Sequence, residues 1–167
     1  MKNPITILFL SILTLTGCSN KTEYVKVGDT VPNFTVQMFD GSIVNITELR
    51  DNVVLLNFWA TWCPPCREEL ARVQKDIIDR FASDKFVFIP ISREDTYDEI
   101  QKFRENTGHE FPMGIDTDRA IFSKFARESI PRNYLIDKEG KIILVEIGYT
   151  EESFAHLINE IEKALDK

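Results

Sequence analysis

The chain lacks any cluster of lysine or arginine, although its 167 residues include 20 basic and 27 acidic side chains, for a formal net charge of −7. An acidic domain without a basic patch has no electrostatic surface for nucleic acid or for anionic lipid. Internal repeats and low-complexity segments are also absent from the sequence. Because 43% of the residues are hydrophobic, the chain has enough apolar material for one core, and its length predicts a single domain with a short appendage.

The N-terminal segment has little charge, with Lys2 as the only charged side chain in residues 1–17. The apolar run from Ile5 to Thr16 is too short to span a bilayer comfortably, and it ends at Leu15-Thr16-Gly17-Cys18, which resembles a bacterial lipobox. We therefore expect a lipoprotein signal peptide over residues 1–17, a lipid anchor on Cys18 with a tether over residues 18–26, and a domain over residues 27–167. An ordinary secretory signal or an uncleaved anchor are the alternatives, and each of them exports the domain.

Cysteine and histidine are scarce, with three and two residues respectively. If Cys18 carries lipid, Cys63 and Cys66 remain in the domain, and one pair is too sparse for a disulfide scaffold. A structural zinc site needs about four protein ligands. His109 and His156 are far from the cysteines in sequence and show no ligand spacing. We therefore expect no metal and no cofactor, and a redox pair is the best use of the two thiols.

The pattern of apolar residues predicts strands that alternate with helices. Asp40-Gly41 between alternating apolar positions predicts a hairpin turn, and the continuous apolar run after Asn52 is typical of a strand buried on both faces. In chain order, the expected elements are a hairpin (Thr35–Ile46), a strand (Val53–Ala60), a helix that ends at Phe81, a strand (Phe86–Ile91), a helix (Tyr97–Thr107), a short helix (Arg119–Ala126), a hairpin (Asn133–Ile136 with Ile142–Ile147) and a helix (Glu151–Leu165). This order predicts an α/β fold with a mixed central sheet flanked by helices.

The cysteine pair falls where the first long helix is expected to begin. Pro64 and Pro65 suit the first turn of a helix, where their missing N–H groups would have had no partner. Cys63 then lies at the extreme N-terminus, close to free amide donors and to the positive end of the helix dipole, which favour a thiolate. We therefore expect Cys63 to be the attacking nucleophile and Cys66, one turn inside, to be the resolving thiol.

Two further side chains near the pair have possible roles. At about 100° per residue, Glu69 falls beside the apolar stripe of the helix, next to Cys66, where a carboxyl group with a raised pKa could take up the proton of that thiol. The alternative is a boundary glutamate whose carboxylate reaches water. For the aromatic residues that flank the motif, we expect Trp62 to form an exposed docking surface and Trp59 to lie partly in the core.

Two segments carry a family resemblance: Asn57–Glu69, with Trp62-Cys63-Pro64-Pro65-Cys66 at its centre, and Ile130–Gly140. They resemble the thioredoxin-like lipoproteins and anchored reductases of the TlpA/ResA type. This resemblance implies a thioredoxin fold with an N-terminal β-hairpin extension, and reductive thiol–disulfide exchange in the cell envelope. It implies a membrane thiol donor, and as substrates apocytochrome c or other exported proteins. It also implies that Glu69 is a functional acid and that Pro131 is a cis-proline opposite the disulfide. From their places beside the cysteines, we expect Trp62 and Pro65 to support the active site as well.

The sequence departs from the family after Pro131, where Arg132-Asn133 replaces the usual pair of small residues such as Thr-Thr. Arg132 could select an acidic partner, stabilise the Cys63 thiolate, or be a solvated side chain. Three other functions remain open from the residues alone. They are a peroxiredoxin-like thiol peroxidase, a copper metallochaperone that uses both thiolates and a histidine, and a domain with a structural disulfide.

Overall fold

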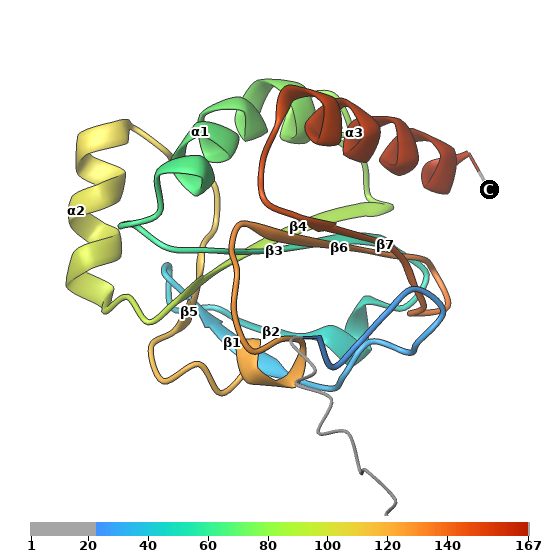
Figure 1. The fold of residues 1–167 in the computed structure, drawn as a ribbon, viewed down its shortest axis with the longest axis horizontal. Coiled ribbons are helices and arrows are strands. Elements are labelled where there is room, and N and C mark those ends of the chain that lie inside the picture. Colours follow the sequence, from blue (N-terminus) through green and yellow to red (C-terminus); the bar gives the residue numbers. More distant parts are fainter. Residues whose placement is uncertain (1–22, 167) are drawn as a thin grey trace, which may run out of the picture.

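The structure is a computed structural model that describes residues 23–166 (Figure 1). The predicted signal peptide and the predicted lipidation site, Cys18, lie outside these residues. In the described part of the chain, no helix is both long enough and apolar enough to cross a membrane.

One seven-stranded mixed sheet forms the centre of the molecule, as the sequence predicts, with the strand order β2-β1-β5-β4-β3-β6-β7. Strands β3, β4 and β5 are parallel to one another, and the remaining pairings are antiparallel. The strands are β1 (Thr35–Met38), β2 (Ile43–Asn45), β3 (Val53–Trp59), β4 (Phe86–Arg93), β5 (Gly114–Asp116), β6 (Arg132–Ile136) and β7 (Ile142–Ile147). Strand β5 was not predicted, because three residues that follow a proline and include a glycine carry no strand pattern.

Three α-helices pack on one face of the sheet. They are α1 (Pro64–Val73), which continues as a π-helical turn over Gln74–Ile78, α2 (Tyr97–Thr107) and α3 (Glu151–Leu165). Each has a clear start signal: Thr96 and Thr150 form capping boxes, and Cys63 caps α1. Gly108 ends α2 with a φ of 72°, a left-handed conformation that suits glycine. Figure 1 shows α1 and α3 side by side over the sheet.

Alternation along β3 and β6 decides which side chains face the helices. Leu55 and Trp59 of β3 belong to the core that includes Leu70 of α1, whereas Leu56 and Phe58 belong to the core on the opposite face. Successive residues of a strand point to opposite faces, so Asn57 faces α1. By the same rule Asn133 of β6, which pairs with Asn57 in the register, also faces α1, and Arg132 faces away.

The opposite face is covered by 3-10 turns and irregular chain, which differs from the expected short helix at Arg119–Ala126. Only Phe122–Lys124 is helical, as one 3-10 turn. Arg119 has a φ of 62°, outside the helical region, and the buried Asp116 carboxylate accepts hydrogen bonds from the N–H groups of Ile121 and Phe122 at 2.9 and 2.8 Å. The Asp116 carboxylate thus takes up backbone N–H groups that an α-helix would pair with backbone carbonyls.

The end of the predicted tether lies against this same face. Glu23 forms a β-bridge with Ala126, and the N–H of Tyr24 donates to the carbonyl of Phe125 at 2.9 Å. Val25 is buried in the second core. Residues 23–26 are therefore packed on the domain. The sequence did not predict this packing, because the segment is polar and has no apolar periodicity.

Gly114 allows β1 and β5 to approach closely, because a Cβ atom there would lie 2.7 Å from Cγ2 of Val36 and 3.1 Å from Cγ1 of Ile91. We expect Gly114→Ala to lower the free energy of unfolding by about 1–3 kcal/mol through overpacking. Chemical denaturation of the full-length chain measures this loss. Gln37→Ala, at an exposed position of β1, is the control and should change stability by less than about 0.5 kcal/mol. Equal stability of Gly114→Ala and wild type would contradict the packing argument.

Candidate active site

A disulfide joins Cys63 and Cys66 at the point where β3 ends and α1 begins. Pro64 and Pro65 are the first two residues of α1, and Cys63 is its N-cap, with an extended backbone at φ −94° and ψ 106°. The Sγ atom of Cys63 accepts a hydrogen bond from the N–H of Cys66 at 3.3 Å. Cys63 is 4% exposed and Cys66 is fully buried, so the N-terminal sulfur is the more accessible of the two.

The loop before the disulfide is held by Asp95, a buried residue that the sequence did not single out. Its carboxylate accepts hydrogen bonds from the N–H and the Oγ1–H of Thr61 at 2.7 and 2.8 Å, and also one from the hydroxyl of Ser92. The carbonyl of Asp95 in turn accepts from Oγ1 of Thr117 at 2.9 Å. One residue thus connects the end of β4 to the active-site loop and to the segment after β5.

The Ile130–Pro131 peptide bond is cis, which is the geometry that the family resemblance implies. The carbonyl oxygen of Ile130 lies 3.8 Å from Sγ of Cys63. Pro131 is buried and directly precedes β6. The segment Ile130–Pro131 therefore lies against the disulfide, although the two segments are 67 residues apart in sequence.

Behind the disulfide, Glu69 is 2% exposed, so its carboxyl group does not reach water as the alternative interpretation required. The Nδ2 atom of Asn133 donates to Oε1 of Glu69 at 2.6 Å, and Nδ2 of Asn57 donates to Oδ1 of Asn133 at 2.9 Å. Oε2 of Glu69 and Oδ1 of Asn57 have no hydrogen-bond partner among the described residues. The three side chains form a buried polar chain from β3 through β6 to α1.

Burial raises the pKa of Glu69 from 4.5 to about 7, and the hydrogen bond from Asn133, together with the nearby Asn57 amide, opposes this rise. Desolvation disfavours the charged carboxylate, whereas amide donors favour it. Glu69 is three residues after Cys66 on α1, a spacing that places two side chains on the same side of a helix. A carboxyl group that titrates near neutral pH therefore lies one turn behind the buried sulfur.

The two tryptophans beside the motif have different environments. Trp62 is 56% exposed, and Cζ of Arg93 lies 5.6 Å from the centroid of its ring system. Trp59 is fully buried against Phe103, rather than partly buried as expected. Pro65 is half-buried at the first turn of α1. Of the two tryptophans, only Trp62, the neighbour of Cys63 in sequence, is exposed to solvent.

Arg132 is neither solvated nor directed at the disulfide, which corrects the expectations for it. It is 2% exposed and faces away from α1, with Nη1 3.2 Å from a carboxylate oxygen of Glu23. Its other nitrogens donate to the carbonyls of Ser129 and Glu128 at 3.2 and 3.0 Å. Of the two residues in the Arg132-Asn133 departure, Asn133 is the one that reaches the helix side of the sheet, where its amide contacts Glu69.

The two histidines contact residues other than the cysteine pair. His109 packs against Phe103 and Phe111, and Nδ1 of His156 lies 2.7 Å from Oε1 of Glu146. Within residues 23–166, no three side chains of the types that ligate metals gather into a group that could hold an ion.

Sequence reasoning missed Asp95, Asn57 and Asn133 as parts of the site. Asn57 carries a readable signal, since a single polar residue inside the apolar run of a buried strand needs a partner. For Asp95 and Asn133 the signal is tertiary, because their partners come from distant segments.

Comparison with known proteins agrees with this geometry. The AhpC/TSA family profile matches residues 27–145. The thiol-disulfide oxidoreductase ResA of Bacillus subtilis (strain 168) is 29% identical over 134 residues, which cover 80% of this chain and 74% of the relative. ResA of Bacillus anthracis is 27% identical over 96% of this chain and 98% of its own length.

A solved structure extends the comparison to the fold. The solution structure of a Bacteroides thetaiotaomicron protein, provisionally described as a protein disulfide isomerase, is 37% identical to this chain, with a TM-score of 0.83. The match covers 88% of this chain and 94% of that one. The chain therefore belongs to the AhpC/TSA family, within which it is a TlpA/ResA-like thiol–disulfide oxidoreductase with the thioredoxin fold.

Proposed function

We propose that this oxidoreductase reduces disulfides of exported proteins, of which apocytochrome c is one candidate, in the cell envelope and from a lipid anchor on Cys18. The proposal depends on one observation above all. The Cys63–Cys66 pair lies at the N-terminus of α1, with the more accessible sulfur outermost and a buried carboxyl group behind the other. A membrane thiol donor would return the pair to its reduced form after each cycle.

The reduced pair transfers two electrons in two exchanges. The Cys63 thiolate attacks one sulfur of the substrate disulfide, so that a mixed disulfide forms and the other substrate sulfur leaves as a thiolate. Cys66 then loses its proton to Glu69 and attacks Sγ of Cys63. The mixed disulfide breaks, the second substrate sulfur leaves as a thiolate, and the Cys63–Cys66 disulfide of the structure results.

The first turn of α1 supports Cys63 as the attacking sulfur. Its Sγ accepts a hydrogen bond from the N–H of Cys66, and the same donor would stabilise a thiolate in the reduced enzyme. Pro64 and Pro65 supply no N–H groups, so Cys66 provides the nearest amide donor on the turn. A single donor lowers the pKa of a thiol less than several would, which favours a reductant over a strong oxidant.

A lipid anchor on Cys18 would hold the active site near a membrane. Because Glu23 already pairs with the domain, only residues 19–22 would separate it from the anchor. The five steps from Cys18 to Glu23 span at most about 18 Å when fully extended. The domain would therefore meet exported proteins and a membrane thiol donor close to the bilayer surface.

The peroxidase alternative has less support from the site. Cys63 already has a sulfur partner three residues away, whereas a peroxidatic cysteine normally lies in a threonine-rich turn without such a partner. A copper site would need a histidine at the pair, whereas His109 packs against Phe103 and His156 contacts Glu146. Peroxide consumption and copper retention after dialysis, measured on the purified chain, test both alternatives.

We expect Cys66→Ser to trap a mixed disulfide with oxidised protein substrate, because Cys63 can attack but the resolving sulfur is missing. Cys63→Ser should trap at least about tenfold less, since Cys66 is fully buried. Non-reducing electrophoresis of both full-length variants after incubation with oxidised insulin measures the adduct. Equal trapping by the two variants would contradict the assigned roles, and trapping by neither would contradict the proposed function.

We expect the rate at which the mixed disulfide is resolved to rise with pH through about 7, because Glu69 accepts the proton of Cys66 only when it is ionised. Glu69→Gln should lower that rate at pH 8 by about 100-fold and remove the inflection near pH 7. Single-turnover kinetics from pH 5 to 9 measure both effects. Glu68→Gln, at an exposed position of the same helix, is the matched control. An unchanged inflection in Glu69→Gln would exclude Glu69 as the proton acceptor.

Asn133 acts as a positioning residue for Glu69, and its hydrogen bond favours the carboxylate. We expect Asn133→Ala to move the inflection to higher pH and so lower the rate at pH 7, because a smaller fraction of Glu69 is then ionised. In the Glu69→Gln background, the same substitution should leave the pH profile unchanged. A change of rate at all pH values without a shift of the inflection would indicate a purely structural role.

A further inference from the structure

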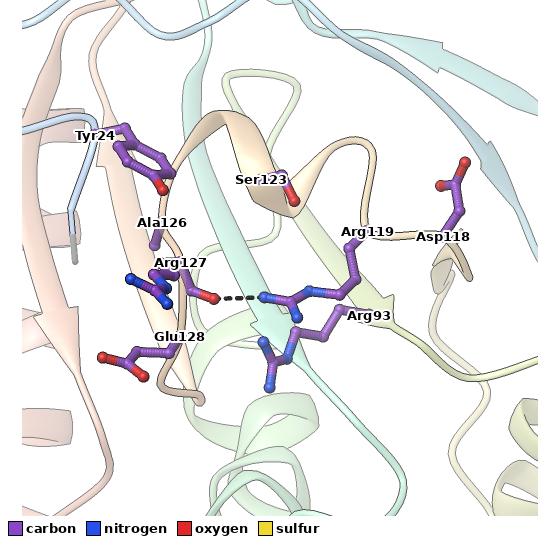
Figure 2. A pocket seen from close by; sticks show the side chains of 8 residues that line it. All are labelled: Tyr24, Arg93, Asp118, Arg119, Ser123, Ala126, Arg127 and Glu128. Atoms are coloured by element: carbon purple, nitrogen blue, oxygen red, sulfur yellow. Dashed lines mark hydrogen bonds between the residues drawn. The ribbon is translucent and has the colours of Figure 1, made fainter. Parts of the chain in front are cut away.

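A pocket of about 610 Å³ lies between the end of β4 and the segment that follows β5. Arg93, Arg119, Arg127 and Glu128 line it (Figure 2). Arg93 also lies beside Trp62, the exposed ring next to the disulfide. The pocket is thus a neighbour of the active site, and the exchange chemistry does not use it.

Arg93 is a buried cation with few partners. It is 8% exposed, and its guanidinium group lies 4.6 Å from the ring centroid of Phe122 and 5.6 Å from that of Trp62. Among residues 23–166, its Nε and Nη1 atoms have no hydrogen-bond partner, and Nη2 lies 3.5 Å from the carboxylate of Glu94. Burial lowers the pKa of Arg93, the nearby Glu94 carboxylate opposes this effect, and the positive charges of Arg119 and Arg132 add to it. The positive charge of Arg93 is therefore only partly balanced by its contacts.

Arg119 increases this imbalance. Its Nη1 atom lies 3.4 Å from the same Glu94 carboxylate, and its Nη2 atom donates to the carbonyl of Arg127, the dashed line in Figure 2. Its Nε atom has no partner in the described part of the chain. Two guanidinium groups thus share one carboxylate, which is itself 38% exposed. Arg132 shows the contrast, because Glu23 and two backbone carbonyls satisfy it.

The acidic residues of the pocket do not supply the missing charge. Asp118 accepts a hydrogen bond from the N–H of Ala120 at 3.0 Å, and Figure 2 shows its carboxylate directed away from the guanidinium groups. Figure 2 also shows the Glu128 carboxylate directed away from Arg93, while the groups of Arg93 and Arg119 lie next to one another and extend toward the Arg127–Glu128 segment.

We propose that this arginine pocket binds an acidic side chain of the polypeptide whose disulfide is reduced, so that the preferred substrates carry aspartate or glutamate near the cysteine that Cys63 attacks. Guanidinium groups pair with carboxylates through charge-assisted hydrogen bonds. The inference rests on the proposed function and specifies its substrate class.

The position of the pocket fits this role. Trp62 contacts Arg93 on one side and is adjacent to Cys63 on the other. On the opposite wall, Glu128 is two residues before Ile130, whose carbonyl oxygen lies 3.8 Å from Sγ of Cys63. A substrate cysteine at Cys63 therefore brings its neighbouring residues close to the pocket. The whole chain has a net charge of −7, so long-range electrostatics disfavour acidic substrates, and any preference for them must come from local contacts.

Two oxidised peptides that differ only in charge test the proposal. Both contain the same Cys-Gly-Gly-Cys disulfide, one with flanking glutamates and the other with glutamines at the same positions. We expect the reduced full-length chain to reduce the glutamate peptide with a kcat/KM about tenfold higher, which is the value of one charge-assisted contact at a partly exposed site. Equal kcat/KM values would overturn the arginine pocket as a specificity site while leaving the proposed function intact. Reduction of neither peptide would overturn the proposed function, and the inference with it.

Variants of the chain test whether the preference for the glutamate peptide arises in the arginine pocket. Arg119→Gln should bring the ratio of the two kcat/KM values close to one. Arg93→Met, which keeps an apolar chain between Trp62 and Phe122, should do the same. Arg80→Gln removes an equal charge beyond the far end of α1 and should keep the ratio. A tenfold ratio that persists in both pocket variants would place the recognition elsewhere and overturn the inference.

Discussion

The hydrogen bond from the N–H of Cys66 to the sulfur of Cys63 is the contact on which the chemistry depends. It exists because Cys63 is the cap of α1, which follows the buried strand β3 after a loop of only three residues, 60–62. The two prolines at the start of α1 leave few other donors near this sulfur. Strand, turn and helix together fix a sulfur that is electrostatically distinct from its partner one turn further along.

The register of the sheet places the polar side chains that lie behind the disulfide. Because Asn57 and Asn133 are paired residues of neighbouring strands, both amides point to the helix face, where Glu69 is buried. In this way the residue that departs from the usual family sequence after Pro131, Asn133, contacts the buried carboxyl group behind the disulfide. A single buried carboxyl group without these amides would hold its proton more tightly, since nothing would favour its charged form.

Most of the fold could be predicted from local patterns, because β3, α1, α2 and α3 each carry their own periodicity and start signals. The resemblance of the segments around Cys63 and Pro131 also implied the redox pair and the cis peptide bond. Local patterns could not show β5, the irregular chain at Arg119–Ala126 or the role of Asp95, since all three depend on hydrogen bonds and packing between distant segments. Arg132 could be singled out because it departs from a family motif. Arg93 could not, because its contacts with Trp62 and Phe122 join segments that are distant in sequence.

The burial of Glu69 also has a thermodynamic consequence. Its pKa is 4.5 in water and about 7 in the folded chain, so folding favours the protonated form. The folded state therefore loses stability as pH rises from about 4.5 to about 7, by a total of about 3 kcal/mol at 1.36 kcal/mol per pKa unit. That is a large share of the roughly 5–15 kcal/mol that stabilises a typical domain. The contribution of Glu69 to stability is thus greatest in mildly acidic surroundings, and it is lost over the pH range in which this carboxyl group ionises.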